Sequence, residues 1–415
     1  MQKLERWNYS AHLIEGGCIM GAFHFVSFNA VLPSMVKSLG APLWVISFMP
    51  ILMYVGFNLP PIFTAHYIEK LDNYKGMVLM TCVAQRLVYL MAALILFTIP
   101  SHYNIIAYSA IALAPFLSGL SGGLSFPAWQ LLLKKTVRAE KLSSLLALRH
   151  IMAALIGIGA GQIVKSTLNN NPGVNGFAYL HLYAFFIMIL SFLVFLLIKE
   201  PHEEQIETKA TLSFKENLKR FPHIIKHNTN LAYFMWARAL LSGLFILSPF
   251  MAIHAKEVTQ LGDSFLGSLL SWQMAGSLCG NTFAGWVGDK KGSRIIMITS
   301  RLAFILLGLW ILFAQNPIEF SCIFFLYGFA FFSSQVGSQT MLIEICDGTE
   351  RASSLAIASL FSMISMIIAS IASSILWGAW ASINILAIVM IVCLLGSLIA
   401  TWAIKEPRKA QISKA

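Results

Sequence analysis

The sequence predicts an all-α membrane protein with twelve transmembrane helices in two similar six-helix bundles. Hydrophobic residues make up 57% of its 415 residues and charged residues only 11%, whereas soluble proteins average roughly 25% charged residues. The apolar residues form runs of about 20 or more, the length that crosses a bilayer as a helix. The predicted spans are residues 10–36, 43–67, 77–99, 105–133, 142–166, 178–199, 229–254, 264–287, 295–315, 318–342, 352–378 and 381–404.

The basic residues are divided unequally between the two predicted sides of the membrane. The formal net charge is +11, with 29 Lys and Arg residues. If the N-terminus is cytoplasmic, only Lys37, Lys165 and Lys256 lie at the opposite side. This asymmetry follows the positive-inside rule and predicts a multi-pass protein of the cytoplasmic (inner) membrane with both termini in the cytoplasm. Because topology explains the basic composition, no nucleic-acid partner is expected.

Short patterns recur in the two halves of the chain. The recurring pairs are Glu140–Leu145 with Glu350–Leu355, Lys199–Pro201 with Lys405–Pro407, and Arg86–Leu87 with Arg301–Leu302. Similar offsets between the members of each pair indicate a duplicated unit. The predicted domains are an N-terminal bundle over 1–200, a cytoplasmic linker over 201–228, a C-terminal bundle over 229–407 and a cytoplasmic tail over 408–415.

A charged stretch between two apolar runs carries a family resemblance. Residues 285–294 read Gly-Trp-Val-Gly-Asp-Lys-Lys-Gly-Ser-Arg. The pattern Gly-x-x-Gly-Asp-Lys-x-Gly-x-Arg resembles the signature loop of the major facilitator superfamily of transporters. The resemblance implies a bacterial-type twelve-helix member that works as a monomer in the bilayer. In the equivalent stretch of the first half, Glu69 stands where Asp289 does, but Ala65 and Ile68 replace two glycines.

The resemblance also implies a cytoplasmic gate. In the family, the acid of each signature loop docks at the start of a helix in the opposite half when the cytoplasmic side closes. Asp289 and Glu69 would play this part, with Lys290 and Arg294 beside Asp289. An acid near a helix N-terminus contributes about 0.3–1 kcal/mol.

Charged residues inside the predicted spans are the main candidates for substrate binding. The arginines within spans are Arg86, Arg149, Arg238 and Arg301, and the acids are Glu15 and Glu344, each near a cytoplasmic end. A charge within the bilayer costs at least ~2.5–3.5 kcal/mol and needs a partner or a water-filled cavity. Because positive charge is in excess, the counter-charge could be an anionic substrate, whose carboxylate or phosphate fits the guanidinium fork.

The resemblance indicates which of these arginines face the transport cavity. The fifth and seventh helices line the cavity in the family, which makes Arg149 and Arg238 the first substrate-binding candidates. Arg86 and Arg301 lie on the third and ninth spans, which are usually peripheral, so structural roles are expected for them. For Arg149 the structural alternative is a pair with Glu15.

Other polar residues within spans are candidates for the same cavity. The substrate-binding candidates are Asn29, Trp129, Gln130, Gln273, Gln335 and Gln339, and the proton-coupling candidates are Glu15, His24 and His150. Gln335 and Gln339 are four residues apart and share a helix face. Burial can bring the protonation of a carboxyl or imidazole close to neutral pH. The structural alternative for all of them is hydrogen bonding between helices.

The predicted function is secondary transport by alternating access of a small organic solute, anionic or amphiphilic, coupled to protons. The sequence has no metal-ligand spacing, phosphate loop or set of catalytic residues, so neither an enzyme nor a cofactor is expected. One alternative is an exporter of lipophilic drugs or metabolites, although the fourth-helix arginine and fifth-helix Gly-Pro pair of such exporters are missing. Another is a membrane sensor or partner protein that binds a ligand without transporting it.

Overall fold

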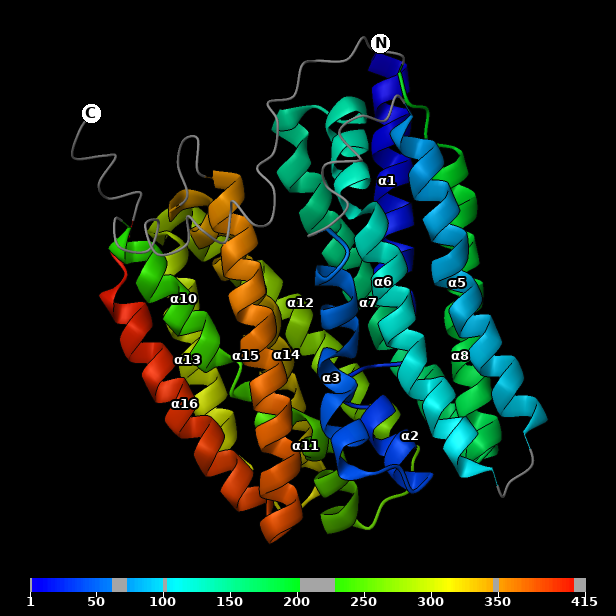
Figure 1. Cartoon of the computed structure of the whole chain (residues 1–415), viewed down its shortest axis with the longest axis vertical. Helices are drawn as coiled ribbons and strands as arrows, with labels where there is room; N and C mark the ends of the chain where they lie inside the picture. Colours follow the sequence, from blue (N-terminus) through cyan, green and yellow to red (C-terminus); the bar gives the residue numbers. More distant parts are fainter. Residues whose placement is uncertain (1, 62–72, 100–102, 202–227, 346–350, 407–415) are drawn as a thin grey trace. The chain divides into compact units, whose positions relative to one another are not determined.

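The fold consists of helices throughout the part of the chain that the structure describes (Figure 1). The computed structural model describes residues 2–61, 73–99, 103–201, 228–345 and 351–406. These residues divide into two compact units. The predicted linker lies almost entirely outside the described residues, so the domain boundaries stay predictions.

The first unit comprises residues 1–41, 52–211 and 262–271. Its helices are α1 (Gln2–Ala22), α2 (Leu32–Ser38), the later part of α3 (Leu43–Asn58), α5 (Tyr74–Thr98), α6 (Asn104–Thr136), α7 (Ala139–Asn170) and α8 (Val174–Leu196). Within the unit, α1 packs against α7 and α8, and α5 packs against α6 and α8.

The second unit comprises residues 42–51, 212–261 and 272–415. Its helices are α10 (Thr229–Leu241), α11 (Leu244–Thr259), most of α12 (Phe265–Lys291), α13 (Ser293–Trp310), α14 (Pro317–Ile345), α15 (Arg351–Trp380) and α16 (Ile383–Ala403). Here α10 packs against α15 and α16, and α13 packs against α14 and α16. The second unit thus repeats the helix pairing of the first, as the recurring sequence patterns predict.

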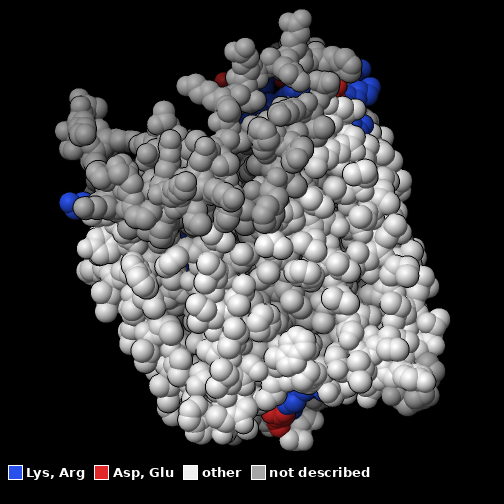
Figure 2. Space-filling view, viewed as in Figure 1, with Lys and Arg blue, Asp and Glu red and all other residues white. Residues whose placement is uncertain are grey.

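The helices agree with a membrane protein in length and composition. Among the described residues, nine helical segments are long and apolar enough to cross a bilayer. Helices α1 and α12 also coincide with predicted spans but are more polar, and α3 is shorter, with 16 residues. On the face drawn in Figure 2, the coloured charged residues lie near the two ends of the view. Most of the described surface between them is white, that is, uncharged, which suits contact with lipid.

Two of the predicted spans are interrupted rather than continuous. The first span is helical only to Ala22, turns over residues 23–31 and resumes as α2, which has Pro33 in its first turn. Proline fits there because the first turn lacks an acceptor for its missing N–H. The seventh span breaks between α10 and α11 at Gly243, where a Cβ would overlap the side chain of Cys393.

Most of the charged signature stretch, residues 285–294, is helical rather than a loop. Helix α12 continues to Lys291 and α13 begins at Ser293. The chain therefore reverses around Gly292, whose φ of 85° is in the left-handed region. A side chain there would also overlap Glu406. The third glycine of the stretch is thus required by both backbone conformation and space.

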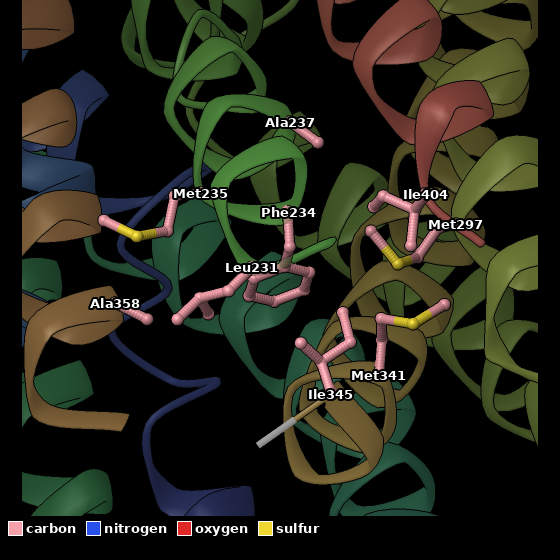
Figure 3. Close-up of a cluster of buried hydrophobic side chains, with 9 residues drawn as sticks. All are labelled: Leu231, Phe234, Met235, Ala237, Met297, Met341, Ile345, Ala358 and Ile404. Atoms are coloured by element: carbon pink, nitrogen blue, oxygen red, sulfur yellow. The ribbon is translucent and has the colours of Figure 1, made fainter. Parts of the chain in front are cut away.

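Each unit has its own tightly packed interior. In the first unit, Gly16 and Gly17 of α1 lie against Arg149 and Met152 of α7, and a Cβ at either glycine would overlap those side chains. Small residues let two helices approach closely enough for such contacts. In the second unit, a buried apolar cluster joins α10, α13, α14, α15 and the end of α16 (Figure 3). The cluster consists of Leu231, Phe234, Met235, Ala237, Met297, Met341, Ile345, Ala358 and Ile404.

Candidate functional site

A buried ion pair joins α1 to α7 in the first unit. Arg149 Nη2 lies 3.3 Å from Glu15 Oε2, and both side chains are less than a tenth exposed. The close approach depends on Gly16, because any side chain there would occupy the space of the guanidinium group. This pair is the structural alternative that the sequence offers for Arg149. Its burial makes it costly to break, since removal of one partner leaves an uncompensated charge.

Helix α6 completes the surroundings of the pair. The guanidinium carbon of Arg149 lies 4.7 Å from the centre of the Trp129 ring, within the range of a cation–π interaction. One turn before Glu15 on α1, His12 Nε2 hydrogen-bonds with Thr136 Oγ1 at 2.9 Å. The predicted residues Glu15, Arg149 and Trp129 therefore come together, whereas the contribution of His12 and Thr136 was not foreseen.

The ion pair leaves hydrogen-bonding capacity unused. Among the described residues, Arg149 Nε and Nη1, Glu15 Oε2 and His12 Nδ1 are buried without a hydrogen-bond partner. Buried polar groups normally have a partner, because an unmade hydrogen bond costs free energy. Arg149 thus retains two donor nitrogens that could bind an oxyanion. No three His, Cys, Asp or Glu residues of the described segments gather as metal ligands would.

The other candidates of the first unit are more scattered. His24 and Asn29 lie in the turn after α1, both half-buried, and Asn29 Oδ1 is a buried atom without a partner. His150 follows Arg149 on α7 and is also half-buried. Gln130 is exposed although Trp129 beside it is half-buried. None of these four has a hydrogen bond that connects it to the Glu15–Arg149 pair within the described segments.

The candidates of the second unit lie on several helices. Gln273 of α12 is buried, 3% exposed, and its Oε1 has no hydrogen-bond partner among the described residues. On α14, Gln335 is half-buried and Gln339 is exposed, whereas Ser334 and Ser338 occupy the buried face. Arg238 of α10 is half-buried.

The arginines of the third and ninth spans differ in their hydrogen bonds. Arg86 Nε donates to the carbonyl oxygen of Met188 at 2.8 Å, Nη1 to that of Cys82 at 2.9 Å, and Nη2 to Ser191 Oγ at 3.2 Å. All three nitrogens of Arg86 are therefore engaged. Arg301 is also fully buried, but in the described residues its Nε and Nη2 have no acceptor.

The predicted cytoplasmic gate is described only in part. Glu69 and the side chain of Asp289 lie outside the described residues. Lys290 is exposed and its Nζ lies 4.5 Å from the centre of the Trp286 ring. The backbone N–H of Arg294 donates to Glu406 Oε2 at 2.9 Å. The gate contacts between halves therefore stay predictions.

The glutamate of the repeated Lys-Glu-Pro pattern caps a helix in each unit. Glu200 accepts from the backbone N–H of Lys75 at 2.9 Å, at the start of α5, and Glu406 accepts from Arg294 at the start of α13. The free N–H groups of a helix start favour such an acid. The sequence repeat marked these residues, but nothing in the pattern showed which helix they contact.

The sequence and the fold of this chain both resemble those of known proteins. The family model described as Major Facilitator Superfamily matches residues 239–415. The matched residues make up less than half of the chain. The solved structure of a D-xylose–proton symporter resembles the chain with a TM-score of 0.72 and 11% identity, over 96% of this chain and 98% of that one. A nucleoside transporter structure gives a TM-score of 0.66 and 15% identity, over 97% and 98%. No curated protein matches the chain in sequence.

The comparisons support a fold rather than a substrate. A bacterial homologue of the iron transporter ferroportin, in an inward-facing state, gives a TM-score of 0.66 at 14% identity, over 97% of this chain and 98% of that chain. These structures belong to transporters of different solutes, and their identities are too low to carry a substrate across. The chain has the fold of these solved transporters, and its described helices suit a multi-pass membrane protein in length and composition.

Proposed function

We propose that this protein is a secondary active transporter that couples protons to the movement of a small organic anion across the cytoplasmic membrane. It works by alternating access, as a monomer with both termini in the cytoplasm. The observation that supports the anion and the proton is the buried Glu15–Arg149 pair, which has unused donors on Arg149. If the substrate is amphiphilic, its apolar part would contact Trp129, whose ring adjoins the same guanidinium group.

The pair suggests how a proton and an anion would bind together. With Glu15 ionised, its carboxylate neutralises Arg149. When Glu15 takes up a proton, Arg149 becomes an unpaired buried cation, and a substrate carboxylate or phosphate can replace Glu15 as its counter-ion. The guanidinium fork binds such groups through two parallel hydrogen bonds. Proton and anion would thus bind cooperatively, with no net change of charge in the site.

The test compares the wild type with Glu15→Gln and Arg149→Lys. The proteins are purified in detergent and binding of succinate, inorganic phosphate, a zwitterion and a lipophilic cation is followed by thermal shift at an acidic and an alkaline pH. A ligand at 100 times its Kd should stabilise the protein by about 2.7 kcal/mol. The wild type should bind the anions more tightly at acidic pH, Glu15→Gln equally at both, and Arg149→Lys weakly at both.

Transport in vesicles then tests the rest of the proposal. An inward proton gradient should drive uptake of the anion by the wild type, and this dependence should be absent from Glu15→Gln. Arg138→Gln is the matched control, because Arg138 pairs with Glu5 in a much more exposed ion pair. Stabilisation by the lipophilic cation alone would favour an exporter, and anion binding without uptake would favour a sensor; either result contradicts the proposal.

A further inference from the structure

Two arginines of the second unit lie one helical turn beyond its apolar cluster. Arg238 follows Phe234 by four residues on α10, and Arg301 follows Met297 by four residues on α13. Phe234 and Met297 both belong to the cluster in Figure 3, and α10 and α13 both pack against α16. Residues four apart share a helix face, so the two arginines occupy one layer. Each arginine brings a positive charge to that layer.

The hydrogen bonds of Arg301 engage only one of its nitrogens. Nη1 donates to the carbonyl oxygen of Met297 at 3.1 Å, to Ser300 Oγ at 3.0 Å and to Ser334 Oγ at 3.2 Å. Nε and Nη2 are buried without a partner among the described residues, and the side chain is 0% exposed. The serines thus hold one edge of the guanidinium group and leave the other edge unused.

Arg238 has even less compensation. Within the described segments its side chain takes part in no hydrogen bond, ion pair or ring contact. No carboxylate of these segments forms an ion pair with either guanidinium group. One turn from Ser334 on the same face of α14, the Ser338 hydroxyl is buried and also lacks a partner. Donors therefore collect in this layer, and the described residues supply no anionic acceptor.

We propose that Arg238 and Arg301 form an anion-binding site within the second unit, which takes a carboxylate or phosphate group of the transported solute. One buried and one half-buried like charge without a counter-ion are unfavourable, and an oxyanion would neutralise them and accept from Nε and Nη2 of Arg301. The guanidinium fork fits both kinds of oxyanion. The inference deepens the proposed function, on which it rests, by assigning an anionic group of the solute to the second unit.

The decisive experiment measures binding and stability in the same variants. Arg238→Gln and Arg301→Lys are compared with the wild type and with Arg138→Gln, in detergent, using succinate and inorganic phosphate as separate probes. We expect Arg238→Gln to weaken binding of at least one probe about tenfold or more. Without a ligand, the same variant should melt at a higher temperature, because it removes a charge that has no counter-ion; a purely structural arginine would give the opposite shift. The probe that loses affinity shows whether the group is carboxylate or phosphate.

The outcomes separate this inference from the proposed function. Anion binding that depends on Arg149 but is unchanged in Arg238→Gln and Arg301→Lys would overturn the inference and leave the proposed function standing. Anion binding lost in these two variants, without uptake by the wild type in vesicles, would support the site and contradict transport. If neither probe binds to the wild type, the inference is wrong.

Discussion

Arg86 and Arg301 occupy corresponding places in the two units but have different surroundings. Each precedes a leucine in the recurring pattern, and each donates through Nη1 to the carbonyl oxygen four residues earlier. Arg86 uses its remaining nitrogens on Met188 and Ser191 of α8, and its guanidinium carbon lies 5.4 Å from the centre of the Phe192 ring. Arg301 leaves the corresponding nitrogens unused.

The difference arises from the neighbouring helix. The Lys-Glu-Pro pattern aligns α8 with α16 and places Ser397 where the first unit has Ser191. Ser397 Oγ donates to the carbonyl oxygen of Ala237 on α10 instead. Arg301 Nη1 donates to Ser334 Oγ of α14 rather than to a serine of α16. A repeated buried arginine can therefore be a structural cross-link in one unit and keep free donors in the other.

The largest expected effect is on stability when the two arginines are replaced by lysine. Arg86→Lys removes several hydrogen bonds from a charged donor and should lower the free energy of unfolding by about 3 kcal/mol. Arg301→Lys should lower it by about 1 kcal/mol or less, because an ammonium group can keep the serine contacts. Unfolding in detergent, followed by helical circular dichroism, measures both. Equal losses would remove the distinction between the two arginines.

A smaller difference is expected at the two glutamate caps. Glu200 accepts from two backbone N–H groups of α5 and lies 3.4 Å from Lys135 Nζ, whereas Glu406 accepts from Arg294 alone among the described residues. Glu200→Gln should cost about 2 kcal/mol and Glu406→Gln about 1 kcal/mol. The Glu200 effect should shrink at high salt, because Lys135 contributes through charge. A larger loss at Glu406 would contradict this ranking.

The smallest effect is expected at a pair of asparagines that the units share. Asn8 exchanges two hydrogen bonds with the backbone of Lys199, both 2.9 Å, and Asn230 exchanges two with Lys405, at 3.1 and 3.2 Å. Asn8→Ala should cost about 1 kcal/mol and Asn230→Ala about half as much, because Asn8 is more deeply buried. Thermal denaturation of both variants checks the order, and a reversed order would count against it.

Hydropathy alone located the helices well, but it did not predict their interruptions. The predicted span 105–133 corresponds to α6, Asn104–Thr136, because a long apolar run has no alternative structure within a bilayer. The break at Gly243 was not predicted, and the close packing of Gly243 against Cys393, far away in the sequence, is not visible in local hydropathy. Similarly, the signature stretch was expected to be a loop, but only Gly292 is needed for the reversal.

The candidate site was predictable only at the level of residue type. Excess arginine within spans pointed to Arg149 and Arg238, and Glu15 was the available partner for Arg149. The roles of Arg86 and Arg301 depend on Ser191 and Ser334, which come from other helices. Serine is common in membrane helices, and its sequence position does not show which neighbour it contacts. The pairing therefore required the packed structure.

The glutamate caps also have a consequence for the synthesis of the protein. The N-terminus of α5 receives Glu200 only 125 residues after Lys75, and that of α13 receives Glu406 112 residues after Arg294. At about 5–20 residues per second, each helix would wait roughly 6 to 25 s for its cap after leaving the ribosome's active centre. In each unit the cap therefore comes late in the sequence, and a ribosome stalled before either glutamate would leave the N-terminus of α5 or α13 uncapped.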